Sequence, residues 1–204
     1  MRTKDVVLIV LLIVAISVSL ASKYYTHFPG DVAVTRWVQS LVSPNLNWAE
    51  GFSRTAEFPG ILLILALIVA LSWALAGWRA ALISIFSLVG MWALGNWLSP
   101  VIARPRPSPE LVHVLRPLSG YSFPSKFALR YAATFGFLAV LAAVKSSGVL
   151  RTALLIGCGA LLILGWVARV ALGAHWPSDV IISYYLGLLW AALLIRFFPN
   201  KLNE

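Results

Sequence analysis

Charged residues are scarce in this sequence. Only 11% of its 204 residues are Asp, Glu, Lys or Arg, and 60% are hydrophobic, whereas about 25% of a typical soluble domain is charged. A water-soluble fold of this size cannot bury so much apolar side chain, and a disordered chain needs the opposite composition. The low charge therefore excludes both classes and indicates an integral membrane protein.

Cysteine and acidic residues are rarer still. The chain has one cysteine, Cys158, and seven Asp and Glu against 16 Lys and Arg, for a formal net charge of +9. One thiol forms no disulfide within the chain, and we interpret Cys158 as a small core residue. The basic excess does not predict a nucleic-acid partner, because basic residues of membrane proteins flank the spans and set their orientation.

Six stretches are long and apolar enough to cross a membrane. A helix needs roughly 20 residues to span about 30 Å of hydrocarbon. We therefore predict an all-α fold, in which residues 1–204 form one membrane domain built as a six-helix bundle. No small-residue cleavage site follows the first stretch, so we expect it to be retained as an anchor. The predicted spans are residues 6–22, 58–78, 80–103, 127–144, 152–168 and 180–195.

The segment between the first two spans contains a short amphipathic pattern. Apolar side chains from Val34 to Leu41 recur at helical spacing, and polar ones such as Asp31 and Arg36 lie on the other face. This spacing predicts a short amphipathic helix on the membrane surface, in the first outer loop. Two roles are open for it, a packing cover over the bundle and a gate for substrate.

The distribution of basic residues indicates an anion site. An even number of spans puts both termini on one side. If that side is cytoplasmic, it carries seven basic residues, including Arg2 and Lys201, against nine outside. Six of the outer nine lie within residues 99–130 and at Arg169. If these six form a binding site and are left out of the count, the cytoplasmic side has the usual excess of basic residues. We therefore predict cytoplasmic termini and an anion-binding cluster on the outer side.

His175 and Asp179 suggest the chemistry of that cluster. They are four residues apart, and Pro177 between them favours a helix start. Asp179 can then orient one imidazole nitrogen and leave the other free to attack phosphorus. Arg106 and Arg169 are fixed forks suited to phosphate, so phosphoryl transfer through a phosphohistidine needs no metal or other cofactor. Taken alone, His175 is also compatible with a hydrogen-bonded interfacial histidine.

These residues belong to three short motifs at the outer ends of the predicted spans. The motifs are Arg106-Pro107, Pro124-Ser125 and the set Arg169, His175 and Asp179. In order and spacing they resemble the motifs of the type 2 phosphatidic acid phosphatase family, six-helix membrane lipid phosphatases related to vanadium haloperoxidases. The resemblance is dense from residue 96 to residue 189.

The resemblance implies a role for each matching residue. His175 would be the nucleophile and Asp179 its orienting partner, while Arg106, Arg169 and Ser125 would hold the phosphate. The partner it implies is a membrane lipid with a phosphate or diphosphate, such as phosphatidate, phosphatidylglycerol phosphate or undecaprenyl diphosphate. Bacterial members generally act at the outer leaflet, which implies a bacterial inner membrane protein whose site faces outward.

Four positions depart from the family's motifs. Where the family has a lysine, this chain has Ser99, and where the family has a Gly-His pair, it has Lys126-Phe127. Ala168 replaces the family's serine before Arg169. A phosphate-binding cation and the general acid are therefore missing, and losing an acid costs about 10²–10⁴-fold in rate. A phosphate leaving group, with a conjugate acid of pKa about 6, needs that proton far less than an alkoxide does. We therefore expect a preference for lipid diphosphates.

Other basic residues have two interpretations each. Lys126 restores the charge missing at Ser99, or it extends from the fourth span toward the interface. Arg104 and Arg116 contact the substrate phosphate, or they contact lipid headgroups. His113 replaces the acid, or it is a solvated loop residue. Two functions are accordingly open: a membrane lipid phosphatase, and a catalytically impaired relative that binds or transports a lipid phosphate.

Overall fold

A computed structural model describes residues 3–197, which form helices joined by loops, with no strand in that range. Arg2 and Lys201, which entered the count of inside charges, lie outside the described residues. The elements are α1 (Thr3–Tyr24), α2 (Asp31–Leu41), α3 (Asn47–Arg54), α4 (Gly60–Ile102), α5 (Lys126–Tyr131), the π-helical turn η1 (Ala132–Gly136), α6 (Phe137–Lys145), α7 (Gly148–Ala171) and α8 (Pro177–Phe197).

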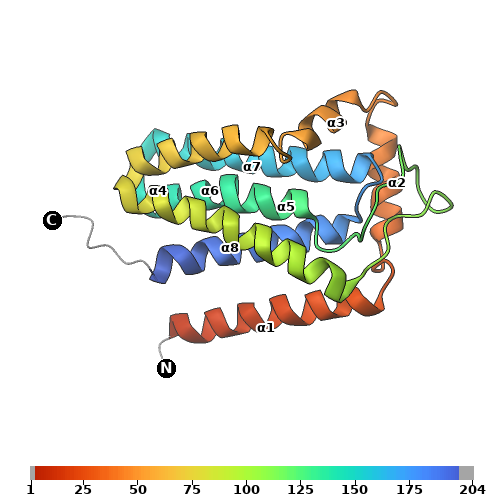
Figure 1. Cartoon of the computed structure of the whole chain (residues 1–204), viewed down its shortest axis with the longest axis horizontal. Coiled ribbons are helices and arrows are strands. Elements are labelled where there is room, and N and C mark those ends of the chain that lie inside the picture. Colours follow the sequence, from red (N-terminus) through yellow and green to blue (C-terminus); the bar gives the residue numbers. More distant parts are fainter. Residues whose placement is uncertain (1–2, 198–204) are drawn as a thin grey trace.

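Five helical segments in the described range are long and apolar enough to cross a membrane: α1, α4, the continuous segment 126–145, α7 and α8. The all-α membrane fold is thus confirmed, whereas the count of six is not. The second and third predicted spans form the 43-residue α4, which contains non-helical backbone at Ala76 and Gly77. A straight helix of that length would extend about 65 Å, but Figure 1 shows α4 doubling back as two antiparallel arms.

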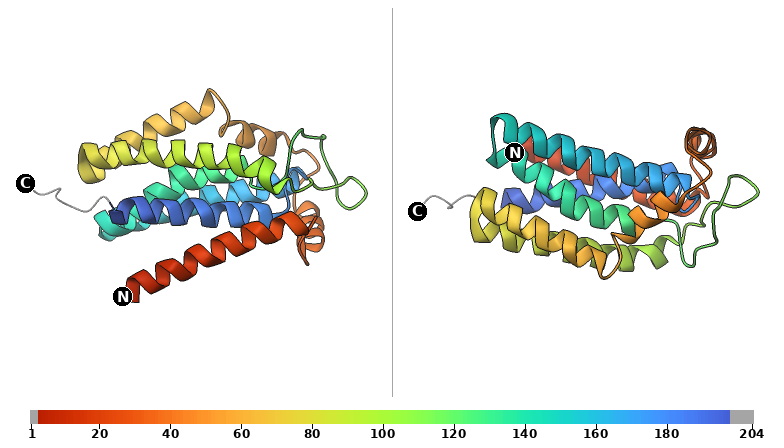
Figure 2. Two further views of the ribbon diagram at one scale, coloured as in Figure 1. Left: turned by 60° about the horizontal axis from the view of Figure 1, so that its bottom comes forward. Right: turned by 90° about the horizontal axis from the view of Figure 1, so that it is seen from above.

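The segment that comprises α5, η1 and α6 is the most buried of these five. Other helices surround it (Figure 2), and small residues let α8 approach it closely. A Cβ atom on Gly187 would lie 2.4 Å from the Cβ of Ala132, so this contact requires glycine. The tight packing gives the N-terminus of α5 a fixed position at the end of the bundle.

The opposite ends of the bundle differ in character. The start of α1 and the end of α8 lie at one end (Figure 1), where Asp5 and Arg196 form an ion pair. At the other end α2 crosses the bundle and packs on α7 and α8, beside α3 and the loop 103–125.

The predicted amphipathic helix is present as α2, but its orientation differs from the expectation. Asp31, assigned to its solvated face, is buried, whereas Trp37 of the expected apolar face is exposed. The reason is tertiary, since Asp31 pairs with Arg104 of a distant loop. The helix α3, which follows α2, was not anticipated.

Candidate active site

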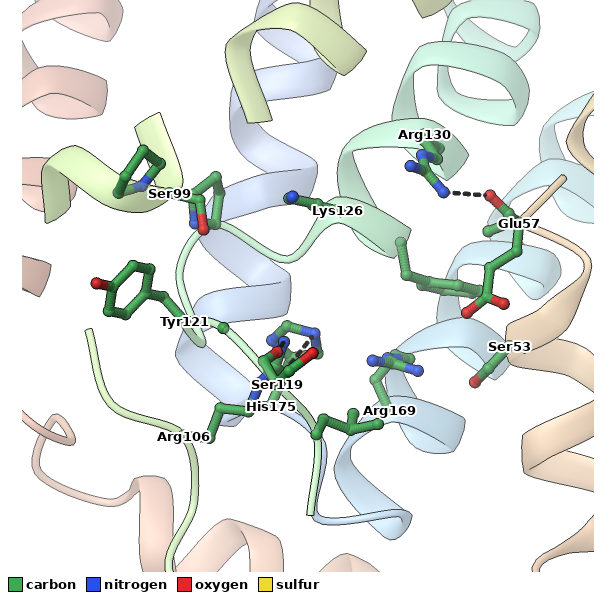
Figure 3. Close-up of a pocket in the computed structure, with 16 residues that line it drawn as sticks. Ser53, Glu57, Ser99, Arg106, Ser119, Tyr121, Lys126, Arg130, Arg169 and His175 are labelled. Atoms are coloured by element: carbon green, nitrogen blue, oxygen red, sulfur yellow. Dashed lines mark hydrogen bonds between the residues drawn. The ribbon is translucent and has the colours of Figure 1, made fainter. Parts of the chain in front are cut away.

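A cavity of about 530 Å³ lies at the end of the bundle that carries α2 and α3 (Figure 3). Four basic side chains line it against one carboxylate, Glu57, so the cavity is suited to an anion. The polar and charged side chains in its wall are Ser53, Glu57, Ser99, Arg106, Ser119, Tyr121, Lys126, Arg130, Arg169 and His175.

The imidazole of His175 is held in one orientation. Its Nδ1 lies 2.7 Å from the carbonyl oxygen of Ser122. A carbonyl only accepts, so Nδ1 carries the proton and donates it. Nε2 keeps its lone pair and accepts a long hydrogen bond from Nη1 of Arg106 at 3.5 Å. Burial, and then the charges of Arg169 and Arg106, lower the pKa of His175 well below its usual 6.5. A neutral imidazole with an unprotonated Nε2 is a nucleophile.

The loop that carries His175 is shaped by its neighbours in the sequence. Gly173 adopts a φ of +62° after the end of α7, and a Cβ there would lie 2.2 Å from the carbonyl oxygen of His113. Only glycine allows both the left-handed backbone and this close approach. Pro177 then starts α8, because its fixed φ and missing N–H suit the first turn of a helix. The site histidine is thereby held between two helix ends.

Two arginines flank His175 in the cavity. Arg106 donates from Nη1 to the carbonyl oxygen of Ala174 at 2.7 Å, and the Arg169 guanidinium lies 5.6 Å from the ring centroid of Phe127. The Nε atoms of both arginines are buried and have no hydrogen-bond partner among the described residues. Buried donors are rarely left unsatisfied. A phosphate would supply the missing acceptors, because guanidinium groups bind it through short charge-assisted hydrogen bonds.

Asp179 does not contact the imidazole in the way the sequence suggested. Its carboxylate accepts from the Ser122 hydroxyl, from Arg104 and, at 3.0 Å, from the backbone N–H of Trp176. The imidazole Nδ1 instead donates to the Ser122 carbonyl. The expectation of a direct Asp179 contact is corrected, because the carboxylate is taken up by donors around the first turn of α8. Asp179 thus reaches the imidazole of His175 through Ser122.

Arg104 lies outside the cavity, and the expectation that it binds phosphate is also corrected. Its side chain has no exposed surface and pairs with two buried carboxylates, Asp31 at 3.1 Å and Asp179. Arg104 and Arg106 are two residues apart, and composition alone does not distinguish them. The chain turns at Ala103, where α4 ends with a φ of 54°. In the loop that follows, Arg104 is buried against the two carboxylates and Arg106 lines the cavity.

The second motif is a helix start. Ser125 is buried and caps α5, with its Oγ accepting from the N–H of Ala128 at 3.4 Å. Its own N–H donates to the Ser183 hydroxyl at 2.9 Å. Ser125 is not part of the cavity wall, so the structure does not show the expected phosphate contact of its side chain. At the position of the family's acid, Phe127 is buried and stacks on Tyr131 with ring centroids 4.2 Å apart.

Lys126 and Ser99 both line the cavity, which is necessary if Lys126 supplies the positive charge that is missing at position 99. Figure 3 shows the Lys126 amine on the side of the cavity where Ser99 lies. His113 does not belong to the cavity wall. Arg116 lies at a smaller hollow of about 70 Å³ beside the cavity, where it pairs with Glu50 at 3.1 Å.

Three residues of this region were missed in the sequence. Glu57 contributes the one carboxylate of the cavity, Ser122 holds His175, and Asp31 pairs with Arg104. Glu57 could have been identified from the sequence, because acidic residues are few and this one immediately precedes a predicted span. Ser122 had no such signal, since its contact with His175 is made by its backbone carbonyl.

The chain is similar to known proteins in its family pattern and in its fold. A family model described as the PAP2 superfamily matches residues 61–203. No curated protein sequence matches the chain. Among solved structures, the chain is similar to the crystal structure of the first transmembrane PAP2 type phosphatidylglycerolphosphate phosphatase from Bacillus subtilis. The TM-score is 0.71 at 21% identity, and the match covers 91% of this chain and 94% of that chain. At this identity the likeness concerns the fold.

Proposed function

The chain belongs to the PAP2 superfamily, and from this premise we propose that it is a membrane lipid phosphatase acting through a phosphohistidine. One observation carries the proposal: the buried, neutral His175 has an unprotonated Nε2 within 3.5 Å of Arg106, and the Nε atoms of Arg106 and Arg169 have no hydrogen-bond partner among the described residues. The cavity opens at the end of a bundle of membrane-spanning helices. A lipid whose chains stay in the membrane can place its phosphate there.

The reaction proceeds in two displacements. Nε2 of His175 attacks phosphorus, and an N–P bond forms as the bond from phosphorus to the leaving oxygen breaks. Arg106 and Arg169 hold the non-bridging oxygens and offset the charge that develops on them. The ring becomes positive, and its Nδ1–H bond to the Ser122 carbonyl stabilises that charge. Water then attacks the phosphohistidine, which releases inorganic phosphate and regenerates neutral His175.

The leaving group selects the substrate in this proposal. Phe127 occupies the position of the family's general acid and has no proton to donate. Such a site suits a leaving group that departs without being protonated. Hydrolysis of an isoprenoid diphosphate releases the lipid as an alkyl phosphate, which is a good leaving group. Hydrolysis of a phospholipid phosphate monoester must instead expel an alkoxide. We therefore favour an isoprenoid diphosphate, hydrolysed at the outer leaflet of a bacterial inner membrane by a protein with cytoplasmic termini.

The experiment that tests the proposal is phosphate release from undecaprenyl diphosphate and from phosphatidate in detergent. The matched pair of variants is His175→Ala and His113→Ala, because His113 lies outside the cavity wall. Release is expected with the wild type and His113→Ala, and only background release with His175→Ala. Wild-type turnover no greater than that of His175→Ala refutes the phosphatase proposal. Turnover of phosphatidate equal to or faster than that of the diphosphate refutes the substrate preference.

A second candidate function is binding or transport of a lipid phosphate without turnover. The observation in its favour is Phe127, which is 6% exposed and packed among aromatic rings, so the acid is replaced by a core residue. The same assay separates the two functions. Binding of a lipid phosphate that depends on Arg106 and Arg169, without phosphate release, supports the second candidate.

A further inference from the structure

Asp31, the first residue of α2, is a buried carboxylate with an unusual number of donors. It is 4% exposed. Its Oδ1 accepts from the N–H of Ser178 at 3.0 Å, and its Oδ2 accepts from the Ser178 hydroxyl at 2.7 Å and the N–H of Phe28 at 2.7 Å. Oδ2 also lies 3.1 Å from Nη2 of Arg104. Asp31 precedes residues 61–203, so the family match does not include it.

Arg104 joins Asp31 to the first turn of α8. Nη2 binds Asp31, and Nη1 binds the carboxylate of Asp179 and, at 3.0 Å, the Ser178 hydroxyl. Nε donates to the carbonyl oxygen of Tyr25 at 3.0 Å. Each guanidinium nitrogen therefore has a partner. A planar fork bound at all its nitrogens is rigid, and a lysine would not reproduce it.

Ser122 lies between this network and His175. Its backbone N–H donates to the carbonyl oxygen of Arg104 at 2.8 Å, and its hydroxyl donates to the carboxylate of Asp179. The same residue accepts the Nδ1 proton of His175 through its carbonyl. The Ser122 hydroxyl is held by Asp179, which Arg104 binds in turn, so Ser122 is linked to the buried ion pairs through its side chain.

We propose that Asp31 and Arg104 are positioning residues for His175, acting through Asp179 and Ser122 to keep Nδ1 protonated and Nε2 directed into the cavity. Arg104 lies between two carboxylates, and Asp31 holds one side of the fork so that the other side meets Asp179 in one geometry. The helix α2 thus supports the site in addition to covering the bundle. The catalytic consequence rests on the proposed phosphatase function, whereas the state of the imidazole does not.

Asp31→Asn is the variant that tests this role. It preserves the shape of the side chain, and its amide oxygen can still accept from the N–H of Ser178. Its NH₂ group then replaces the carboxylate oxygen that accepts from Arg104. The matched control is Gln39→Leu on the same helix. Gln39 also ties α2 to the bundle, through the carbonyl oxygens of His113 at 2.7 Å and Ala171 at 3.2 Å, but it is not connected to Ser122.

The first measurement is the ¹⁵N spectrum of the His175 ring in detergent. His27→Gln and His113→Gln leave His175 as the one histidine, since the chain has three. The wild-type ring is expected as the Nδ1–H tautomer, Asp31→Asn is expected to add the Nε2–H tautomer, and Gln39→Leu is expected to match the wild type. An unchanged spectrum in Asp31→Asn overturns the proposal, and so does an equal change in Gln39→Leu. If Asp31→Asn does not fold, Arg104→Lys is measured in its place with the same criteria.

The second measurement is the division of the effect between kcat and KM. Misplacing a reacting group by about 1 Å costs about 10²-fold in rate, so Asp31→Asn is expected to lower kcat by about that factor. KM is expected to stay within about twofold, because Arg106 and Arg169 are untouched. A rise in KM at unchanged kcat overturns the proposal. An inactive wild type would instead refute the phosphatase function, and the ring spectrum would still decide the role of Asp31.

Discussion

Replacement of Arg104 by methionine separates its buried role from the phosphate-binding role that its position in the sequence suggested. The side chain of Arg104 has no exposed surface, and its guanidinium also lies 4.7 Å from the ring centroid of Phe28. Methionine keeps much of the hydrocarbon stem and removes the charge. Asp31 and Asp179 are then left as two buried carboxylates without their shared cation.

The magnitude follows from that loss. Removing one partner of a buried ion pair costs about 3–5 kcal/mol, because the remaining charge stays desolvated. For a chain of this length that corresponds to a melting temperature lower by about 6–20 °C. The control is Arg36→Met on α2. Arg36 is exposed and donates one hydrogen bond, to the carbonyl oxygen of Leu111 at 2.8 Å, so its loss is expected to change stability by at most about 0.5 kcal/mol.

The assay is thermal unfolding in one detergent, followed by intrinsic tryptophan fluorescence. It compares the wild type, Arg104→Met, Arg36→Met, Asp31→Asn and the double variant Arg104→Met with Asp31→Asn. The double variant is expected to lose less stability than the losses of Arg104→Met and Asp31→Asn added together, because Asp31→Asn removes one of the two carboxylates that Arg104→Met leaves unpaired. If Arg104→Met melts like Arg36→Met and raises KM for lipid phosphate, Arg104 is a phosphate ligand and the buried network is refuted.

Three further predictions concern the site itself. Phe127→His together with Lys126→Gly is expected to raise phosphatidate hydrolysis by about 10²–10⁴-fold by restoring an acid; no gain in steady-state phosphate release would contradict the interpretation of Phe127. Because the pKa of His175 is lowered, its neutral form persists as the pH falls, so the acid limb of kcat/KM should lie below pH 6.5. A limb above 6.5 in the pH–rate profile would contradict this. Gly173→Ala forces an L residue to a φ of +62°, which costs about 1–2 kcal/mol, and its Cβ meets the His113 carbonyl. It should lower both melting temperature and activity, and wild-type values for both would disprove the close approach.

The membrane spans were predictable because hydrophobicity acts locally. A helix in lipid satisfies its own backbone, so a long apolar run is sufficient to indicate it. The predicted span 127–144 is the helical segment 126–145 of the structure. The predicted break near Arg79 corresponds to the bend at Ala76 and Gly77, although there the helix count differs. The third motif was predictable for a similar reason, since its residues lie within one helix end, one loop and the next helix start.

The roles of individual polar residues were decided only by the tertiary structure. The sequence alone determined a basic, membrane-spanning bundle with arginines and a histidine at one end, because composition and short spacings carry that information. It did not separate Arg104 from Arg106, nor connect Asp31 with Asp179, which are brought together from opposite ends of the chain. Which arginine lines the cavity and which is buried against carboxylates depends on the path of the loop after α4 and on how α2 packs. Such long-range contacts leave no periodic pattern in a sequence, and here they determine how the histidine is held.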